Sequence, residues 1–300
     1  MAAKQLVYAS IATGLTAAFC WGTADYMSRS QSERVGYYRT IIYSHMVTLL
    51  AVLVIVPVIS PNLAFPVYPV LALIGAGIIN FVAFVFLYRA FHRGVVSVVA
   101  PVVYTYPAVT AVLAVVVLGA SLSIIQVVAL VCIIAGVILL STRFSELYAY
   151  LRGTGSPSLT KGVRLAVGAS LCFGMVYIGI GYAAPSVSVV LPVMFLRIVA
   201  ISAGFLLAPV LKQETKPSRH VLSKTMVAMG VLEAFGFLAF TYGIEAAGST
   251  LPVVTALSGM GGAVAASYGL AFLKERLEPN QMLGVILSLA GVFALLYLGG

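Results

Sequence analysis

Leu118-Gly119-Ala120-Ser121-Leu122 is matched by Leu273-Lys274-Glu275-Arg276-Leu277 at a shift of 155 residues, and at the same shift Gln126 and Gly136 are matched by Gln281 and Gly291. Further upstream, Phe86, Tyr88 and Gly94 match Phe240, Tyr242 and Gly248 at a shift of 154, and Cys20-Trp21-Gly22 matches Cys172-Phe173-Gly174 at 152. Such small drifts are typical of loop insertions between two copies of one unit. The chain is therefore predicted to be a duplication, a pattern found in polytopic membrane proteins.

The composition indicates that both copies lie in a membrane. Hydrophobic residues make up 62% of the 300 residues and charged residues 8%, which leaves too little polar surface for a soluble fold. Ten apolar runs approach or exceed the roughly 20 residues that a helix needs to span a bilayer. They lie at 6–27, 37–59, 69–92, 95–117, 124–141, 163–183, 191–211, 224–245, 250–272 and 280–298.

The longest polar insert, Thr142 to Lys161, separates the two copies. We therefore predict an all-α polytopic membrane protein, with a first five-helix repeat over 1–141, a cytoplasmic linker over 142–162 and a second five-helix repeat over 163–300.

The net charge of +9 follows the expected membrane topology. Fifteen of the seventeen Lys and Arg residues fall in or beside alternate loops, which leaves Lys4 at the N-terminus and Arg197 inside a span. Because basic loops stay in the cytoplasm, both termini are predicted to face outward, and the second repeat is inverted relative to the first. The expected location is a bacterial inner (plasma) membrane, and binding to nucleic acid is not expected.

The sequence does not favour a catalytic site at a membrane face. Cys20, Cys132 and Cys172 lie inside apolar spans at spacings that fit no metal site or disulfide framework. The three histidines are scattered, and no paired carboxylates have a catalytic spacing. We therefore expect no catalytic residues, no metal and no cofactor.

Motifs in both halves resemble a known superfamily. The block from Leu87-Tyr88-Arg89-Ala90 to Gly136, with Gly94, Pro101 and Gln126, resembles the drug/metabolite transporters, and more narrowly the EamA family of ten-helix exporters. Ala120 stands where that family usually has glutamate, whereas Glu275 keeps it in the second half. Tyr104-Thr105-Tyr106-Pro107 is similar to a stretch of the YddG-type amino-acid exporters. The resemblance implies a basket of helices around a central cavity that opens to alternate sides.

Glu233 is the sharpest candidate for the cavity, because an ionisable group in the middle of a span is costly and marks function by default. It is a candidate proton carrier, or else a protonated carboxyl that bonds to a neighbouring helix. Asn80 is equally central in the third span. The predicted substrate-binding residues are Trp21, Asn80, Phe84, Tyr88, Tyr104, Phe173, Tyr177, Glu233, Phe237, Phe240 and Thr241.

Other charged and aromatic residues have ordinary explanations. Trp21 belongs either to the cavity wall or to the interfacial aromatic belt, and Asp25 is expected to pair with Arg29 at four-residue spacing. Snorkelling towards an interface accounts for Arg197, and His45 is expected to be a hydrogen-bonded packing residue.

Prolines and glycines mark the expected gates. The fourth span holds Pro101 and Pro107, which would kink it, and the ninth holds Gly259 and Gly261. Glycines can also serve close packing, which is the favoured role in the ninth span. The predicted gating residues are Pro101, Pro107, Gly259 and Gly261.

The expected lining has few cations, which disfavours phosphorylated substrates. We predict a secondary transporter that exports a small neutral or zwitterionic metabolite, amino acids first, by alternating access. An exporter of organic cations or drugs is the alternative, because Tyr and Trp walls attract cations. A passive channel or a polytopic membrane enzyme is less favoured. The protein is expected to act as a monomer in the lipid bilayer, with a proton as a candidate coupling ion.

Overall fold

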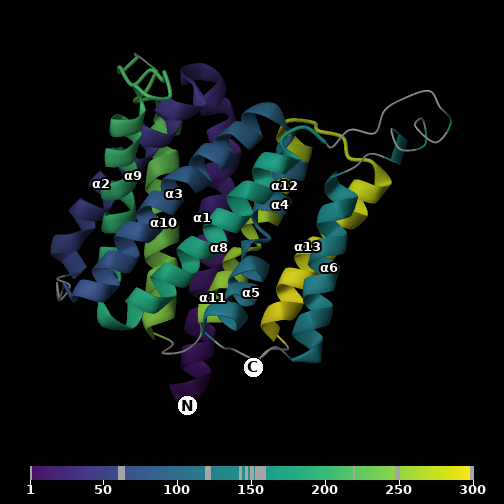
Figure 1. Ribbon diagram of the computed structural model, residues 1–300, viewed down its shortest axis with the longest axis horizontal. Helices are drawn as coiled ribbons and strands as arrows, with labels where there is room; N and C mark the ends of the chain where they lie inside the picture. Colours follow the sequence, from purple (N-terminus) through teal and green to yellow (C-terminus); the bar gives the residue numbers. More distant parts are fainter. Residues whose placement is uncertain are drawn as a thin grey trace.

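A computed structural model describes residues 2–59, 65–118, 123–141, 160–218, 220–246 and 251–297, together with residues 144, 145, 148 and 152. Within these ranges the chain is helical, and no strand is present (Figure 1). The turn around Ala120 and most of the linker predicted over 142–162 lie outside the described residues.

The helices follow the order that the apolar runs predict. In the first half they are α1 (Ala2–Val35), α2 (Tyr37–Ile59), α3 (Val67–Arg93), α4 (Val96–Val103), α5 (Tyr106–Leu118) and α6 (Ile124–Ser141). In the second half they are α8 (Val163–Ala183), the 3-10 helix η1 (Ala184–Ser186), α9 (Val190–Leu207), α10 (Lys224–Ala246), α11 (Leu251–Ser258), α12 (Gly261–Phe272) and α13 (Pro279–Tyr297). Each predicted span falls on one helix, except that the fourth and the ninth each fall on two.

Length and composition allow several of these segments to cross a bilayer. Six stretches of the described chain are long and apolar enough, and three further apolar helices are shorter. Large apolar side chains such as Val58 and Val116 point outward, with 84% and 76% of their surface exposed. Such an apolar exterior fits contact with lipid. The chain is therefore a multi-pass membrane protein, and the number of ten crossings stays a prediction.

Helix packing repeats when the two halves are exchanged. α1 packs against α10, as α8 packs against α3, and α12 packs against α1, as α5 packs against α8. α2 and α9 pack against each other, and so do α6 and α13, which stand together at one edge (Figure 1). The two sets of contacts match because α1 corresponds to α8 and α3 corresponds to α10. Two copies of one unit therefore form a single body around a shared interface.

Both predicted gate regions are interrupted helices. The fourth span breaks between α4 and α5 at Tyr104 and Thr105, where Pro107 has no N–H to bond back to the preceding turn. The ninth breaks between α11 and α12 at Gly259 and Met260. The expectation that the glycines of the ninth span serve packing was therefore incomplete, because the helix also breaks there. Interrupted helices at matching places in the two halves are typical of transporter sites.

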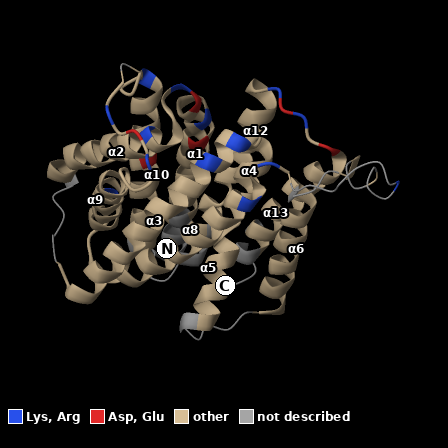
Figure 2. Cartoon of the chain, turned by 45° about the horizontal axis from the view of Figure 1, so that its top comes forward, with Lys and Arg blue, Asp and Glu red and all other residues tan. Residues whose placement is uncertain are grey.

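Charge divides the molecule into two ends. The start of α1 and the end of α13 lie at the same end of the molecule (Figure 1). Lys and Arg residues gather away from it, in the upper part of Figure 2. This separation fits the predicted topology, with basic loops in the cytoplasm and the chain ends on the other side.

Candidate functional site

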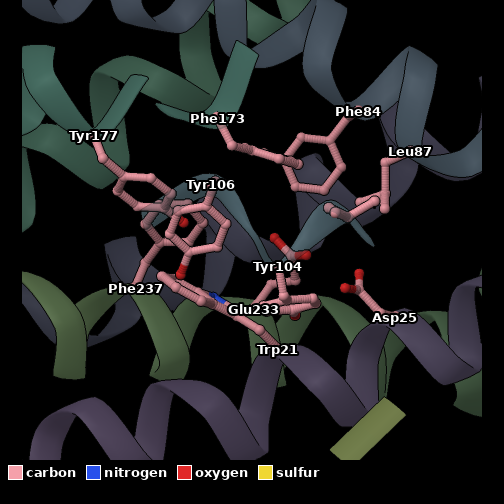
Figure 3. A pocket seen from close by; sticks show the side chains of 11 residues that line it. Trp21, Asp25, Phe84, Leu87, Tyr104, Tyr106, Phe173, Tyr177, Glu233 and Phe237 are labelled. Atoms are coloured by element: carbon pink, nitrogen blue, oxygen red, sulfur yellow. The ribbon is translucent and has the colours of Figure 1, made fainter. Parts of the chain in front are cut away.

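A pocket lies where the two halves meet, between α1, α3, α4, α5, α8 and α10 (Figure 3). About 340 Å³ of atom-free space lies within it, part of which is open to the surroundings. Its lining residues are Trp21, Asp25, Phe84, Leu87, Val103, Tyr104, Tyr106, Phe173, Tyr177, Glu233 and Phe237. Seven of the predicted substrate-binding residues are among them.

The repeat explains why α1 and α8 both line this pocket. Trp21 corresponds to Phe173, and one helical turn later Asp25 corresponds to Tyr177. All four side chains line the pocket. Since the two helices occupy equivalent places in the two halves, the same two faces turn inward. The positions are equivalent, but only the first half carries a carboxylate there.

Most of the pocket wall is aromatic. Tyr106 stacks on Tyr177 with ring centroids 4.5 Å apart, and Trp21 meets the ring of Phe237 edge-on at 4.8 Å. Phe84 meets Phe173 edge-on at 5.4 Å. These are the offset and edge-to-face geometries that aromatic pairs prefer. The wall is therefore built from interlocked rings contributed by both halves.

Four predicted binding residues stand behind this wall rather than in it. Phe240 supports Trp21 and Tyr177, with ring centroids at 5.5 Å and 5.0 Å. Tyr88 packs against Phe84 at 5.5 Å. Thr241 donates a hydrogen bond of 2.9 Å to the carbonyl of Phe237 in its own helix. Asn80 is buried, and its amide has no hydrogen-bond partner among the described residues.

Glu233 reaches the pocket with a partner that the sequence did not reveal. The guanidinium of Arg197, on α9, donates a hydrogen bond of 2.6 Å to its carboxylate. Arg197 is wholly buried and also lies over the ring of Phe237 at 4.5 Å, and its Nη1 atom is 3.1 Å from Nε2 of His45. The expectation that Arg197 snorkels to an interface is therefore wrong. The charge of the buried Glu233 carboxylate is therefore compensated inside the protein, by Arg197.

Asp25 lines the pocket, although the sequence pattern predicted that it would pair with Arg29. Its expected partner Arg29 instead pairs with Glu275 at 2.5 Å and with Glu33 at 3.3 Å. Asp25 is 4% exposed and lines the pocket beside Tyr104. The equivalence with Tyr177 was the signal that could have predicted this position.

The predicted gating residues lie beside the pocket. Pro101 and Pro107 are buried in α4 and α5, on either side of the break. A Cβ atom on Gly261 would lie 2.5 Å from the ring of Tyr104, so Tyr104 can occupy its place only because residue 261 is glycine. Gly259 is buried at the second break. In the ninth span, the close packing against Tyr104 and the break in the helix therefore occur at the same place.

Glu275 connects helices at the basic end of the molecule, where it pairs with Arg29, one helical turn after Asp25 on α1. Its carboxylate accepts hydrogen bonds from the backbone N–H groups of Val96 at 2.9 Å and Ser97 at 2.8 Å, and from the Ser97 hydroxyl at 2.7 Å. A carboxylate at a helix N-terminus satisfies free N–H groups and complements the helix dipole. With Arg29 attached as well, Glu275 ties α1 to the start of α4.

The described part of the chain holds no group of three His, Cys, Asp or Glu side chains that could bind a metal ion. The polar chemistry of the pocket therefore rests on Asp25, Glu233 and the tyrosine hydroxyls.

Comparison with known proteins gives a family and a fold. The model of the EamA-like transporter family matches residues 9–142 and again residues 160–297. A solved crystal structure matches with a TM-score of 0.69 at 15% identity, over 97% of this chain and 97% of that one. At such identity the likeness shows the fold alone. No curated protein matches the chain.

Proposed function

Because the chain belongs to the EamA-like transporter family of the drug/metabolite transporter superfamily, we propose that it exports a small organic metabolite by alternating access. The site of transport is the aromatic pocket between the two halves. We further propose that the protein works as a monomer in a bacterial plasma membrane, with both chain ends on the outer side.

The observation that carries this proposal is the position of the pocket between two interrupted helices. The break at Tyr104 and Thr105 brings Tyr104 to the pocket, and Gly261, the first residue after the break at Gly259 and Met260, packs against the Tyr104 ring. A helix that is already interrupted can bend without losing further backbone hydrogen bonds. Rocking of the two repeats about these breaks would open the pocket to each side in turn.

The lining favours substrates with a compact apolar body. Rings make up most of the wall, and a few polar groups among them can fix the orientation of a bound molecule. Amino acids with aromatic or aliphatic side chains are therefore one candidate class. Phosphorylated metabolites are disfavoured, because the buried Arg197 already binds Glu233.

Organic cations are a second candidate class. The pocket places the faces of Trp21 and several tyrosines around two carboxylates, and aromatic faces attract cations strongly where water is excluded. This arrangement accommodates an ammonium group as well as the amino group of an amino acid.

Reconstitution tests the transport proposal. The purified protein is reconstituted into proteoliposomes, and the vesicles are loaded with one labelled compound at a time from a panel of amino acids and organic cations. Flux is measured with and without a pH gradient. Saturable flux that is stimulated by unlabelled substrate on the opposite side is expected of a carrier. Flux that does not saturate would indicate a channel instead, and absence of flux for the whole panel would contradict the proposed substrate classes.

Coupling to protons through Glu233 can be tested in the same vesicles. If Glu233 carries the coupling proton, Glu233→Gln removes the response to the pH gradient, while the protein that stays folded despite the lost ion pair still shows counterflow of substrate. A variant that keeps the full gradient response would show that coupling does not run through Glu233. The ion pair with Arg197 makes this test necessary, because protonation of Glu233 would leave a buried guanidinium without its counter-ion.

A further inference from the structure

The charges around the pocket do not balance. Glu233 is neutralised by Arg197 at 2.6 Å. Asp25 has no ion-pair partner within the described ranges, and the nearest basic residue on its own helix, Arg29, is held by Glu275 and Glu33. With both carboxylates ionised, the lining therefore holds one negative charge that the protein does not compensate.

Figure 3 shows how this charge is presented. Asp25 and Glu233 direct their carboxyl groups into the same pocket from α1 and α10. An ionised carboxylate such as that of Asp25 has several lone pairs with which to accept hydrogen bonds from a ligand. The rings of Tyr104 and Trp21 lie on the same side of Asp25 in this view, and aromatic rings attract cations.

From this arrangement we infer that Asp25 is the residue that recognises the substrate, by binding its ammonium group. The pocket then selects amines with an apolar body, and prefers those whose carboxylate is absent or masked as an amide over free amino acids. The inference rests on the proposed function and ranks its two candidate classes.

The preference for amines follows from the cost of burying unpaired charge. An ammonium group pairs with Asp25 and removes the uncompensated charge of the pocket. A neutral alcohol of the same shape leaves that charge in place. The carboxylate of a free amino acid would bring a second uncompensated negative charge next to that of Asp25, and Arg197 already binds Glu233. Net repulsion therefore opposes zwitterions and excludes anions.

Tryptophan fluorescence provides a direct test, because Trp21 is the only tryptophan of the chain and lines the pocket. The purified protein in lipid nanodiscs is titrated with 2-phenylethylamine, phenylalaninamide, phenylalanine, 2-phenylethanol and 3-phenylpropionate. The two cations are expected to bind at least about tenfold more tightly than the alcohol or the zwitterion, as befits one charged hydrogen bond. The anion is expected not to bind. Equal binding of amine and alcohol would overturn the inference.

Asp25→Asn is the matched variant. Asparagine has nearly the size and shape of aspartate and keeps a side-chain oxygen acceptor, so the packing is retained while the charge is lost. Its affinity for 2-phenylethylamine is expected to fall at least about tenfold and its affinity for 2-phenylethanol to stay the same. An unchanged preference for the amine would overturn the inference. If Asp25→Asn does not fold, Asp25→Glu, which keeps the charge, must still prefer the cations.

Binding and flux separate this inference from the proposed function. If amines bind in a manner that depends on Asp25 but no compound is transported, the transport proposal fails and the recognition site stands. If saturable flux occurs and Asp25→Asn transports amines and alcohols in the wild-type proportion, the recognition site fails and the transport proposal stands.

Discussion

The Nη2 atom of Arg197 lies 2.6 Å from the Oε2 atom of Glu233, with 0% and 3% of the two side chains exposed. The two residues come from neighbouring helices, α9 and α10, and the guanidinium also lies over the rings of Phe84 and Phe237 at 5.2 Å and 4.5 Å. Glu233 is therefore fixed in place by a buried counter-charge. The pocket is left with Asp25 as its uncompensated carboxylate.

Breaking this ion pair from one side should destabilise the protein strongly. Glu233→Gln leaves the buried Arg197 charge without its partner, at an expected cost of about 3–5 kcal/mol. The double variant Glu233→Leu with Arg197→Met removes both charges and should recover most of that loss. Thermal or denaturant unfolding in detergent measures both. Glu214→Gln is the matched control, because Glu214 pairs with Arg39 at the surface and is 72% exposed, so its loss should cost less than about 1 kcal/mol. Equal effects at positions 233 and 214 would contradict this account.

Gly261 should not tolerate a methyl group. Gly261→Ala would place a Cβ atom 2.5 Å from the ring of Tyr104, and the ring can move away only by disturbing the pocket. We expect a loss of most substrate flux in proteoliposomes and a lower unfolding temperature. Gly75→Ala is the control on α3, where an added Cβ meets nothing within 4 Å. It should keep full flux and gain up to about 1 kcal/mol, because alanine favours helix more than glycine does. Normal flux in Gly261→Ala would show that this close contact is not needed for transport.

Two phenylalanines on α10 allow the pocket side of this helix to be compared with its exposed side. Phe237→Ala removes a ring that lines the pocket and contacts Trp21 at 4.8 Å. Loss of about 1.5 kcal/mol of aromatic contact should raise KM for flux about tenfold. Phe235 is two residues away and 53% exposed, so Phe235→Ala should leave KM unchanged. If both substitutions change KM equally, the pocket is not the substrate site.

Glu275 should be worth more than its neighbour Glu33, although both pair with Arg29. Glu275→Ala leaves the N–H groups of Val96 and Ser97 without their acceptor, and the expected cost in the free energy of unfolding is about 2 kcal/mol. Glu33→Ala removes only a pair at 3.3 Å whose glutamate is 54% exposed, which should cost less than about 1 kcal/mol. The ranking of the two unfolding free energies decides the matter, and the reverse order would contradict the role of Glu275 at the start of α4.

Several features of this protein could be derived from its sequence because they depend on composition and repetition. The apolar runs define the membrane helices, and the shift of 152 residues that relates Trp21 to Phe173 identifies two faces of equivalent helices. Both faces line the pocket. Helical spacing from Glu233 led to Phe237, and helical spacing from Asn80 led to Phe84, since residues four positions apart share one face.

The tertiary structure alone decided which charges meet. Arg197 and Glu233 lie 36 residues apart on different helices, and a rotation of either helix by one residue, about 100°, would separate them. Asp25 could have paired with Arg29 on its own helix, but Glu275 takes Arg29 and packing against α10 and α12 turns Asp25 to the pocket. A sequence fixes where charges occur along each helix, whereas the rotation and neighbours of the helices fix which charges are compensated. For that reason the sequence predicted a transporter with a polar aromatic pocket, and only the packed structure singled out Asp25.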